Sequence, residues 1–103
     1  MHAGNNVSRE NPKPLYNWDE AKRASNFRDH RVDFVAAHEF DWDSALVYVD
    51  DREDYGELRE VAIGYIGVRL HVLVFTRHDE RIRIISMWKA KKSDVRKYVE
   101  GIR

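Results

Sequence analysis

The sequence contains no cysteine, which excludes disulfide bonds, thiol nucleophiles and zinc sites built from thiolates. It also lacks an apolar run long enough to span a membrane, and its first residues carry no apolar stretch of the signal-peptide kind. Only two prolines are present, both within residues 1–14. These absences predict a cytoplasmic protein without a membrane partner.

The chain has no net charge, because 18 basic side chains balance 18 acidic ones. The two signs are nevertheless separated: residues 39–60 carry nine acids and two bases, whereas residues 81–103 carry eight bases and two acids. A neutral total argues against nonspecific binding to nucleic acid. The basic C-terminal quarter indicates either a local phosphate-binding surface or a helix with a solvated cationic face.

A length of 103 residues predicts one domain, and a hydrophobic share of 43% with twelve aromatic residues can supply its core. Residues 1–14 are polar and contain nothing that could build a core, so they are expected to be a flexible arm. The folded domain is therefore expected over residues 15–103.

Two helices are predicted near the N-terminus. The first begins at Asn17 as its cap, with Glu20 completing a capping box, and ends near residues 29–31. The second is short and is capped by Asp33. The inward-facing side of the first helix is expected to comprise Trp18, Ala21, Ala24 and Phe27.

The following segments change to the pattern of strands. They are rich in β-branched and aromatic residues, are separated by short turns and an acidic loop at 50–60, and span residues 46–49, 61–66, 70–76 and 81–88. On the last strand, simple alternation places Ile82, Ile84, Ser86 and Trp88 on one face.

A final helix is expected after Ser93. Its apolar stripe would be Val95, Tyr98, Val99 and Ile102. The predicted fold class is α+β: two N-terminal helices, a three- to four-stranded antiparallel sheet with helices on one face, and a C-terminal helix.

Three blocks of this sequence, in the same order, resemble the BrnT family of toxins. The first runs from YNWDEAK at residues 16–22 through Asn26 and His30 to Asp33-Phe34. The second is the acidic loop DDREDYGE at residues 50–57, followed by Arg59. The third is RIIS at residues 83–86, followed by Lys89-Ala90 and Tyr98.

This resemblance implies a RelE-like ribonuclease with an RNA substrate. No cofactor is expected. The resemblance also implies a BrnA-type antitoxin with a ribbon-helix-helix domain, through which the complex contacts operator DNA, and a hetero-oligomer such as a 2:2 assembly. An acidic antitoxin segment is expected to cover the basic groove of the toxin.

Two residues depart from the family pattern. Trp88 stands where the family usually has Arg before Lys-Ala, and Arg31 stands where Gly usually follows the His. These departures keep an alternative open, in which the chain is catalytically impaired and acts as an antitoxin-binding operon co-repressor. A small sheet-based RNA-binding protein without a partner is a third alternative.

RNA can be cut without metal when its own 2′-hydroxyl attacks the adjacent phosphate, provided that charge is stabilised and protons are moved. Arg83 and Lys89 are the candidates for phosphate contacts, and the family position of His30 implies proton transfer. Lys22 and Asn26 share a helical face with His30, which predicts a common groove. The substrate-binding candidates are Lys22, Asn26, Arg59 and Trp88, the last by stacking on a base.

Each candidate also has a structural interpretation. His30 could end a helix, Arg83 could pair across strands, Lys89 and Lys22 could be solvated, Arg59 could shape its loop and Trp88 could pack in the core. No spacing typical of metal ligands occurs on a predicted helix, so no metal is expected.

Overall fold

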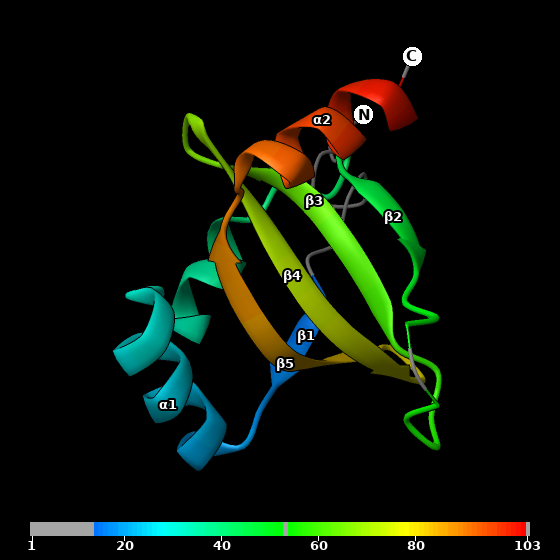
Figure 1. Ribbon diagram of the computed structural model, residues 1–103. Helices are drawn as coiled ribbons and strands as arrows, with labels where there is room; N and C mark the ends of the chain where they lie inside the picture. The colour runs from blue at the N-terminus through cyan, green and yellow to red at the C-terminus, as the bar shows by residue number, and fades with distance from the viewer. Residues whose placement is uncertain (1–13, 53, 103) are drawn as a thin grey trace, which may run out of the picture.

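The computed structural model describes residues 14–52 and 54–102 (Figure 1). Most of the predicted arm at residues 1–14 therefore lies outside the described residues. The elements follow in the order β1 (Leu15–Asn17), α1 (Glu20–His30), η2 (Phe34–Glu39), β2 (Leu46–Val49), β3 (Glu60–Ile66), β4 (Arg69–His78), β5 (Arg81–Lys89) and α2 (Lys92–Gly101), where η2 is a 3-10 helix. The α+β class is confirmed.

The sheet has five strands in the order β1-β5-β4-β3-β2. The pairs among β2, β3, β4 and β5 are antiparallel as predicted, whereas β1 pairs with β5 in parallel, so the sheet is mixed. Strand β1 was not predicted, because three residues are too short to show alternation. Asn17 belongs to this strand, and the cap of α1 is Asp19, whose side chain accepts from the Ala21 N–H at 2.8 Å.

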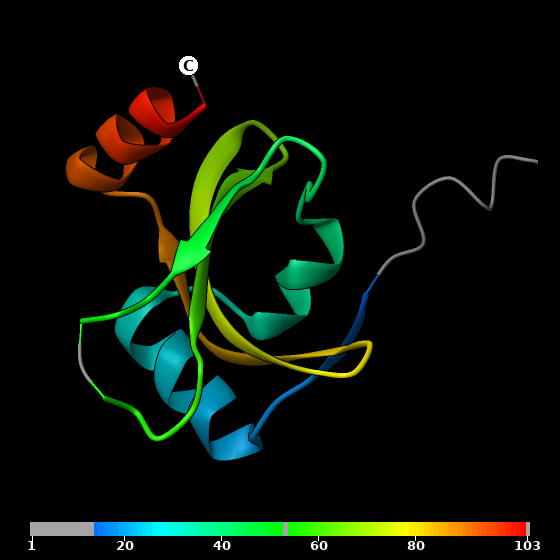
Figure 2. The same ribbon diagram turned by 90° about the vertical axis from the view of Figure 1, so that its right-hand side faces the viewer.

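Helices lie on both faces of the sheet, with η2 behind it and α2 in front (Figures 1 and 2). Behind the sheet, a core forms around Phe34, Phe75 and Ile84. In front, a second core forms around Ile63, Val72 and Tyr98. The expectation that helices cover one face only is therefore wrong.

Helix α1 does not bury the face that its apolar spacing predicts. Ala21, Ala24 and Phe27 are exposed, whereas Asn26 is the buried residue of the helix. The reason is that α1 packs beside β5 through a polar contact rather than over the sheet through an apolar stripe.

A β-bulge in β5 changes which side chains share a face. The pairing with β4 shifts between Val74 and Phe75, so that Ile85 is the extra residue. As a result Met87 joins Ile82 and Ile84 in the rear core. Simple alternation had placed Met87 opposite them, and it fails here because a bulge inverts every position that follows.

Helix α2 begins two residues earlier than expected, with Lys91 rather than Ser93 as its cap. The carboxylate of Asp94 accepts from the Lys91 N–H at 2.9 Å. Of the predicted apolar stripe only Tyr98 is buried, and the three other members remain 39–54% exposed.

Candidate functional site

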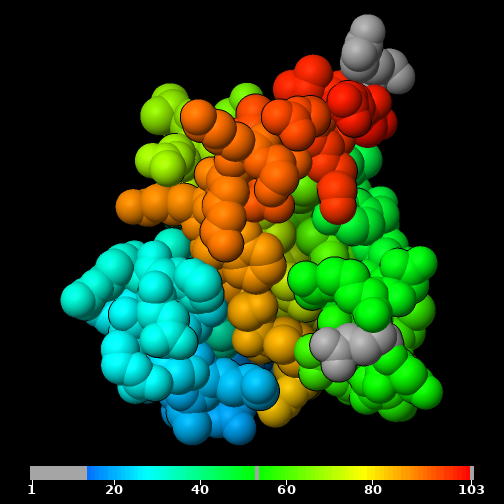
Figure 3. Space-filling view, in the orientation of Figure 1, coloured from blue at the N-terminus to red at the C-terminus, as the bar shows by residue number. Residues whose placement is uncertain are grey.

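The front face of β5 lies in a hollow between three other parts of the chain. Figure 3 shows β5 at the surface between α1 on one side and the 50–60 loop on the other, with α2 above. In the β4–β5 pairing, the side chains of Arg83, Ser86 and Trp88 point away from the rear core. They therefore lie on this front face. We call this hollow the front groove.

His30 and Trp88 meet at one end of the front groove. Their ring centroids are 5.8 Å apart and the rings are tilted by 38°. His30 is the last residue of α1 and Trp88 precedes the end of β5, so the contact joins two separate elements. Two of the seven predicted site residues are thus side by side.

The Trp88 indole is fixed on its other side by α2. Its Nε1–H donates to the Asp94 carboxylate at 3.1 Å, and the ring packs against the front core. The core-packing interpretation of Trp88 is therefore supported. Trp88 as a whole remains partly exposed.

Arg83 lies on the front face with no acidic partner. In register it is flanked by Asn17 on β1 and Thr76 on β4, both of them neutral. Within the described part of the chain, its guanidinium makes no ion pair or side-chain hydrogen bond, unlike Arg23, Arg52 and Arg77. The cross-strand ion pair considered for Arg83 is absent between the described residues.

Two buried polar atoms beside Arg83 also lack partners among the described residues. They are the Asn17 Oδ1 and the Thr76 Oγ1 atoms. Nothing in the sequence pattern marks these residues, because β1 was not recognised and Thr76 is an ordinary strand residue. Arg83 thus sits in a polar row across three strands whose hydrogen-bonding capacity is not saturated.

Asn26 has a different role from the predicted contact with substrate. Its Nδ2 donates to the carbonyls of Val32 at 3.0 Å and Met87 at 2.8 Å, and its Oδ1 accepts from the Met87 N–H at 3.1 Å. The side chain replaces a neighbouring strand where β1 has ended. At 5% exposure its amide is fully used, so it positions α1 rather than binding RNA.

Lys22 and His30 flank Asn26 along α1. Because they are four residues from it in each direction, all three lie on the side of the helix that meets β5. Lys22 is exposed. Lys22 and His30 are thus exposed on the side of α1 that meets β5, with the buried Asn26 between them.

Lys89 is not brought to the same face as Arg83. It pairs with His71, and both residues follow the alternation that directs Met87 to the rear. Burial, together with the nearby cations Arg69 and Lys89, lowers the pKa of His71. Lys89 therefore remains a candidate only at the end of the strand, behind Trp88.

Arg59 makes its described side-chain contacts within the 50–60 loop. Its guanidinium lies 4.0 Å from the Tyr55 ring centroid and 3.4 Å from the Glu57 carboxylate. These contacts support the loop-shaping interpretation over substrate binding.

The same loop contains a carboxylate that sequence analysis did not single out. Asp50 is buried, and its oxygens accept from Arg52 at 2.7 Å and from the Tyr55 hydroxyl at 3.2 Å. The hydrogen bond from Arg52 is the main cause that lowers the pKa of Asp50 to about 2. Asp50 is therefore ionised at neutral pH and anchors the loop.

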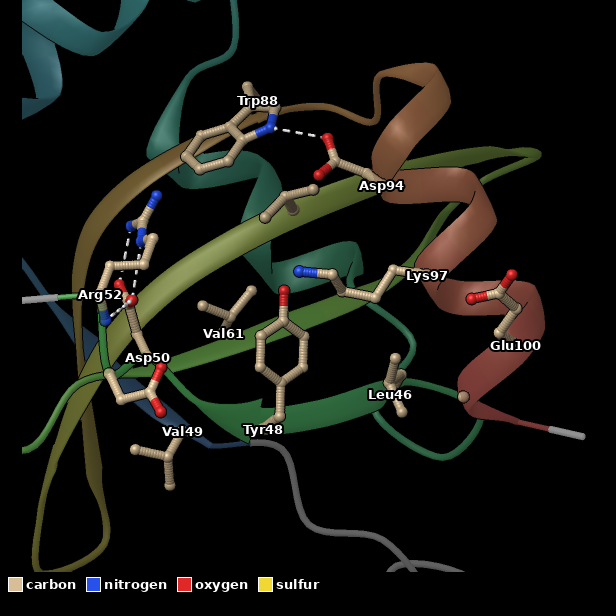
Figure 4. A pocket seen from close by; sticks show the side chains of 13 residues that line it. Leu46, Tyr48, Val49, Asp50, Arg52, Val61, Trp88, Asp94, Lys97 and Glu100 are labelled. Carbon is tan, nitrogen blue, oxygen red and sulfur yellow. Dashed lines mark hydrogen bonds and ion pairs between the residues drawn. The ribbon is translucent and has the colours of Figure 1, made fainter.

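A pocket of about 670 Å³ adjoins the groove between β2, this loop and α2 (Figure 4). Its floor is apolar, with Leu46, Tyr48, Val61 and Trp88 among its lining residues. Carboxylates and cations line its rim. Trp88 is shared by the pocket and the groove.

No group of three or more potential metal ligands occurs among residues 14–52 and 54–102. In the same described part, no helix is long and apolar enough to cross a membrane.

Over residues 18–94, the chain matches a family described as "Ribonuclease toxin, BrnT, of type II toxin-antitoxin system". The matched region is more than half of the chain and includes Lys22, His30, Arg83 and Trp88. No curated protein sequence matches the chain significantly.

Proposed function

Because this chain belongs to the BrnT family of ribonuclease toxins of type II toxin–antitoxin systems, we propose that it is a metal-independent endoribonuclease that inhibits translation and is neutralised by a BrnA-type antitoxin. An antitoxin partner follows from the family itself. The front groove is the proposed site of cleavage, with the RNA backbone lying between α1 and β5.

The observation that carries this proposal is the uncompensated charge of Arg83. A cation on a partly buried sheet face without a carboxylate partner among the described residues is available for an anion. A bidentate guanidinium matches the geometry of a phosphate. Arg83 is proposed to bind the scissile phosphate and to stabilise the charge that grows on it during attack.

His30 is proposed to move a proton. The 2′-oxygen attacks phosphorus as its proton is removed, the bond from phosphorus to the 5′-oxygen breaks, and a proton is delivered to that oxygen. The products are a 2′,3′-cyclic phosphate and a 5′-hydroxyl. An imidazole at the open end of α1, held beside Trp88, suits either proton transfer.

Lys22 is proposed to contact a neighbouring phosphate, and the partly exposed Trp88 to contact a base. Lys89 is proposed to contact an RNA phosphate only at the end of β5. In the cell, the BrnA-type antitoxin would contribute a ribbon-helix-helix domain, so that the hetero-oligomer reaches operator DNA indirectly.

A second candidate function rests on Trp88. The Trp88 indole is neutral, so it cannot supply the positive charge of the Arg that the family usually has here. Its N–H is also already donated to Asp94. The chain would then bind its antitoxin and help to repress the operon without efficient cleavage.

Induced expression in cells that lack the antitoxin separates the two functions. An active toxin is expected to arrest growth and fragment RNA, and the Arg83→Ala variant is expected to do neither. Normal growth with intact RNA rules out the first candidate. Gain of toxicity in Trp88→Arg would then locate the defect at Trp88.

A further inference from the structure

The pocket beside Trp88 has a charge pattern that argues against RNA. Its rim carries the carboxylates Asp50, Asp51, Asp94 and Glu100 but only two cations, Arg52 and Lys97. A phosphate placed here would face an excess of negative charge. The pocket is therefore distinct in chemistry from the front groove, although it shares Trp88 with it.

Both cations of the pocket already have a partner within it, a carboxylate for Arg52 and an aromatic ring for Lys97. Arg52 donates to both oxygens of Asp50 at 2.7 Å. The Lys97 ammonium lies 5.0 Å from the centroid of the Tyr48 ring, so the aromatic face already stabilises it.

Two of the carboxylates, by contrast, are unpaired. Asp51 and Glu100 are exposed and make no ion pair or hydrogen bond with the residues that the structure describes. Figure 4 shows Glu100 and Lys97 projecting from α2 on one side of the pocket, with Leu46 and Tyr48 on the other. An apolar floor below unpaired acids matches a segment that is apolar on one side and basic on its flanks.

The position of the pocket favours an extended partner over a small molecule. It opens beside β2, the last strand of the sheet, and its lining includes Val49, which is 51% exposed. A volume of about 670 Å³ accommodates several apolar side chains. The exposed edge of β2 leaves room for the rest of the segment.

We propose that this pocket is where the antitoxin docks, through an amphipathic segment whose apolar side chains enter over Leu46, Tyr48 and Trp88 and whose Lys or Arg side chains pair with Asp51 and Glu100. The inference rests on the antitoxin partner that the family implies. It differs from the expectation that an acidic antitoxin segment covers the basic groove, because it places a basic segment in the neighbouring acidic pocket. A segment seated here touches Trp88, whose other neighbour is His30, so docking covers one end of the proposed cleavage site.

Charge reversal at the unpaired acids tests this inference. The variants Asp51→Lys, Glu100→Lys and their combination are compared with the exposed acids Glu39→Lys and Glu80→Lys, which lie outside the pocket. Glu100 occupies the last turn of α2, where a cation is favourable, so its reversal should not destabilise the fold. The probe is the purified antitoxin encoded with this chain, and affinity is measured by surface plasmon resonance.

Each reversal in the pocket is expected to weaken antitoxin binding by about tenfold, the double variant by more, and the controls by less than about twofold. An antitoxin with a basic residue changed to Glu should bind Glu100→Lys better than it binds the unmodified toxin. Cleavage of RNA by the free toxin variants should stay unchanged.

Equal affinity for all variants overturns the inference. So does a loss of RNA binding instead of antitoxin binding, or a change in self-association of the free chain, because the occupant would then be RNA or a second copy. If the chain proves unable to cleave RNA while the pocket variants still lose antitoxin, the proposed function fails and the docking site stands.

Discussion

Arg31 ends α1 in a left-handed conformation, with φ 60° and ψ 28°, that costs free energy for any residue with a Cβ. This explains why the family pattern has Gly after the His. We predict that Arg31→Gly raises the free energy of unfolding by about 1 kcal/mol. Arg28→Gly, inside the same helix, should instead lower it by about 1 kcal/mol. Urea unfolding measures both, and a destabilised Arg31→Gly would contradict the explanation.

Asp50 gives the fold an acid-sensitive anchor. Its pKa in the folded chain is about 2, below the ordinary 3.8, so its stabilising contribution is complete above pH 3.8 and is lost as the pH falls toward 2. Asp50→Asn should lower stability at neutral pH by about 2 kcal/mol and flatten this acid-induced loss. Asp51→Asn is the matched control, since Asp51 is exposed. Equal pH profiles for the unmodified chain and Asp50→Asn would refute the anchor.

For individual residues, the residue type predicted the structural role better than the helical spacing did. The cap at Asp33 was predicted and is confirmed by its bond from the Val35 N–H. Asn26 was expected to face a substrate groove and is instead buried. Its role depends on the end of β1 and the edge of β5, which no local pattern encodes.

Among the elements, the attachment of α1 to β5 depends on the two hydrogen bonds between Asn26 and Met87, and a third bond joins Asn26 to the Val32 carbonyl. Asn26→Ala leaves the Met87 amide and carbonyl without partners in a buried place, so we predict a loss of about 3 kcal/mol in unfolding free energy. Ser25→Ala, one residue away, removes only a bond to the Lys22 carbonyl within the helix and should change stability by less than about 0.5 kcal/mol. Similar stabilities for the two variants would contradict the clamp.

Strand positions were predictable because their composition is local. The segment 46–49 coincides with β2, and the next three strands differ from prediction by one or two residues at their ends. The face of each side chain on β5 was not predictable, because the bulge at Ile85 arises from pairing with β4. Strand β1 escaped notice for the related reason that only its neighbour β5 makes it a strand.

In the whole molecule, two segments of opposite charge that are far apart in the sequence lie close together. The acidic 50–60 loop and the basic C-terminal quarter line the same pocket, from opposite sides. Composition showed both segments but not that β2 and α2 would bring them together. The unpaired charges of the two surfaces differ in sign: Arg83 is cationic in the front groove, and Asp51 and Glu100 are anionic in the pocket.

The central claim is that the front groove cuts RNA with Arg83 and His30 and without a metal ion. The most direct test incubates the purified chain with an RNA oligonucleotide in excess EDTA and analyses the ends of the products. We predict fragments with 2′,3′-cyclic phosphate and 5′-hydroxyl ends, and rates lower by about 100-fold or more for Arg83→Ala and His30→Ala. The exposed controls Arg69→Ala and His78→Ala should cleave normally. Cleavage that EDTA abolishes, or that survives unchanged in Arg83→Ala, would contradict the claim.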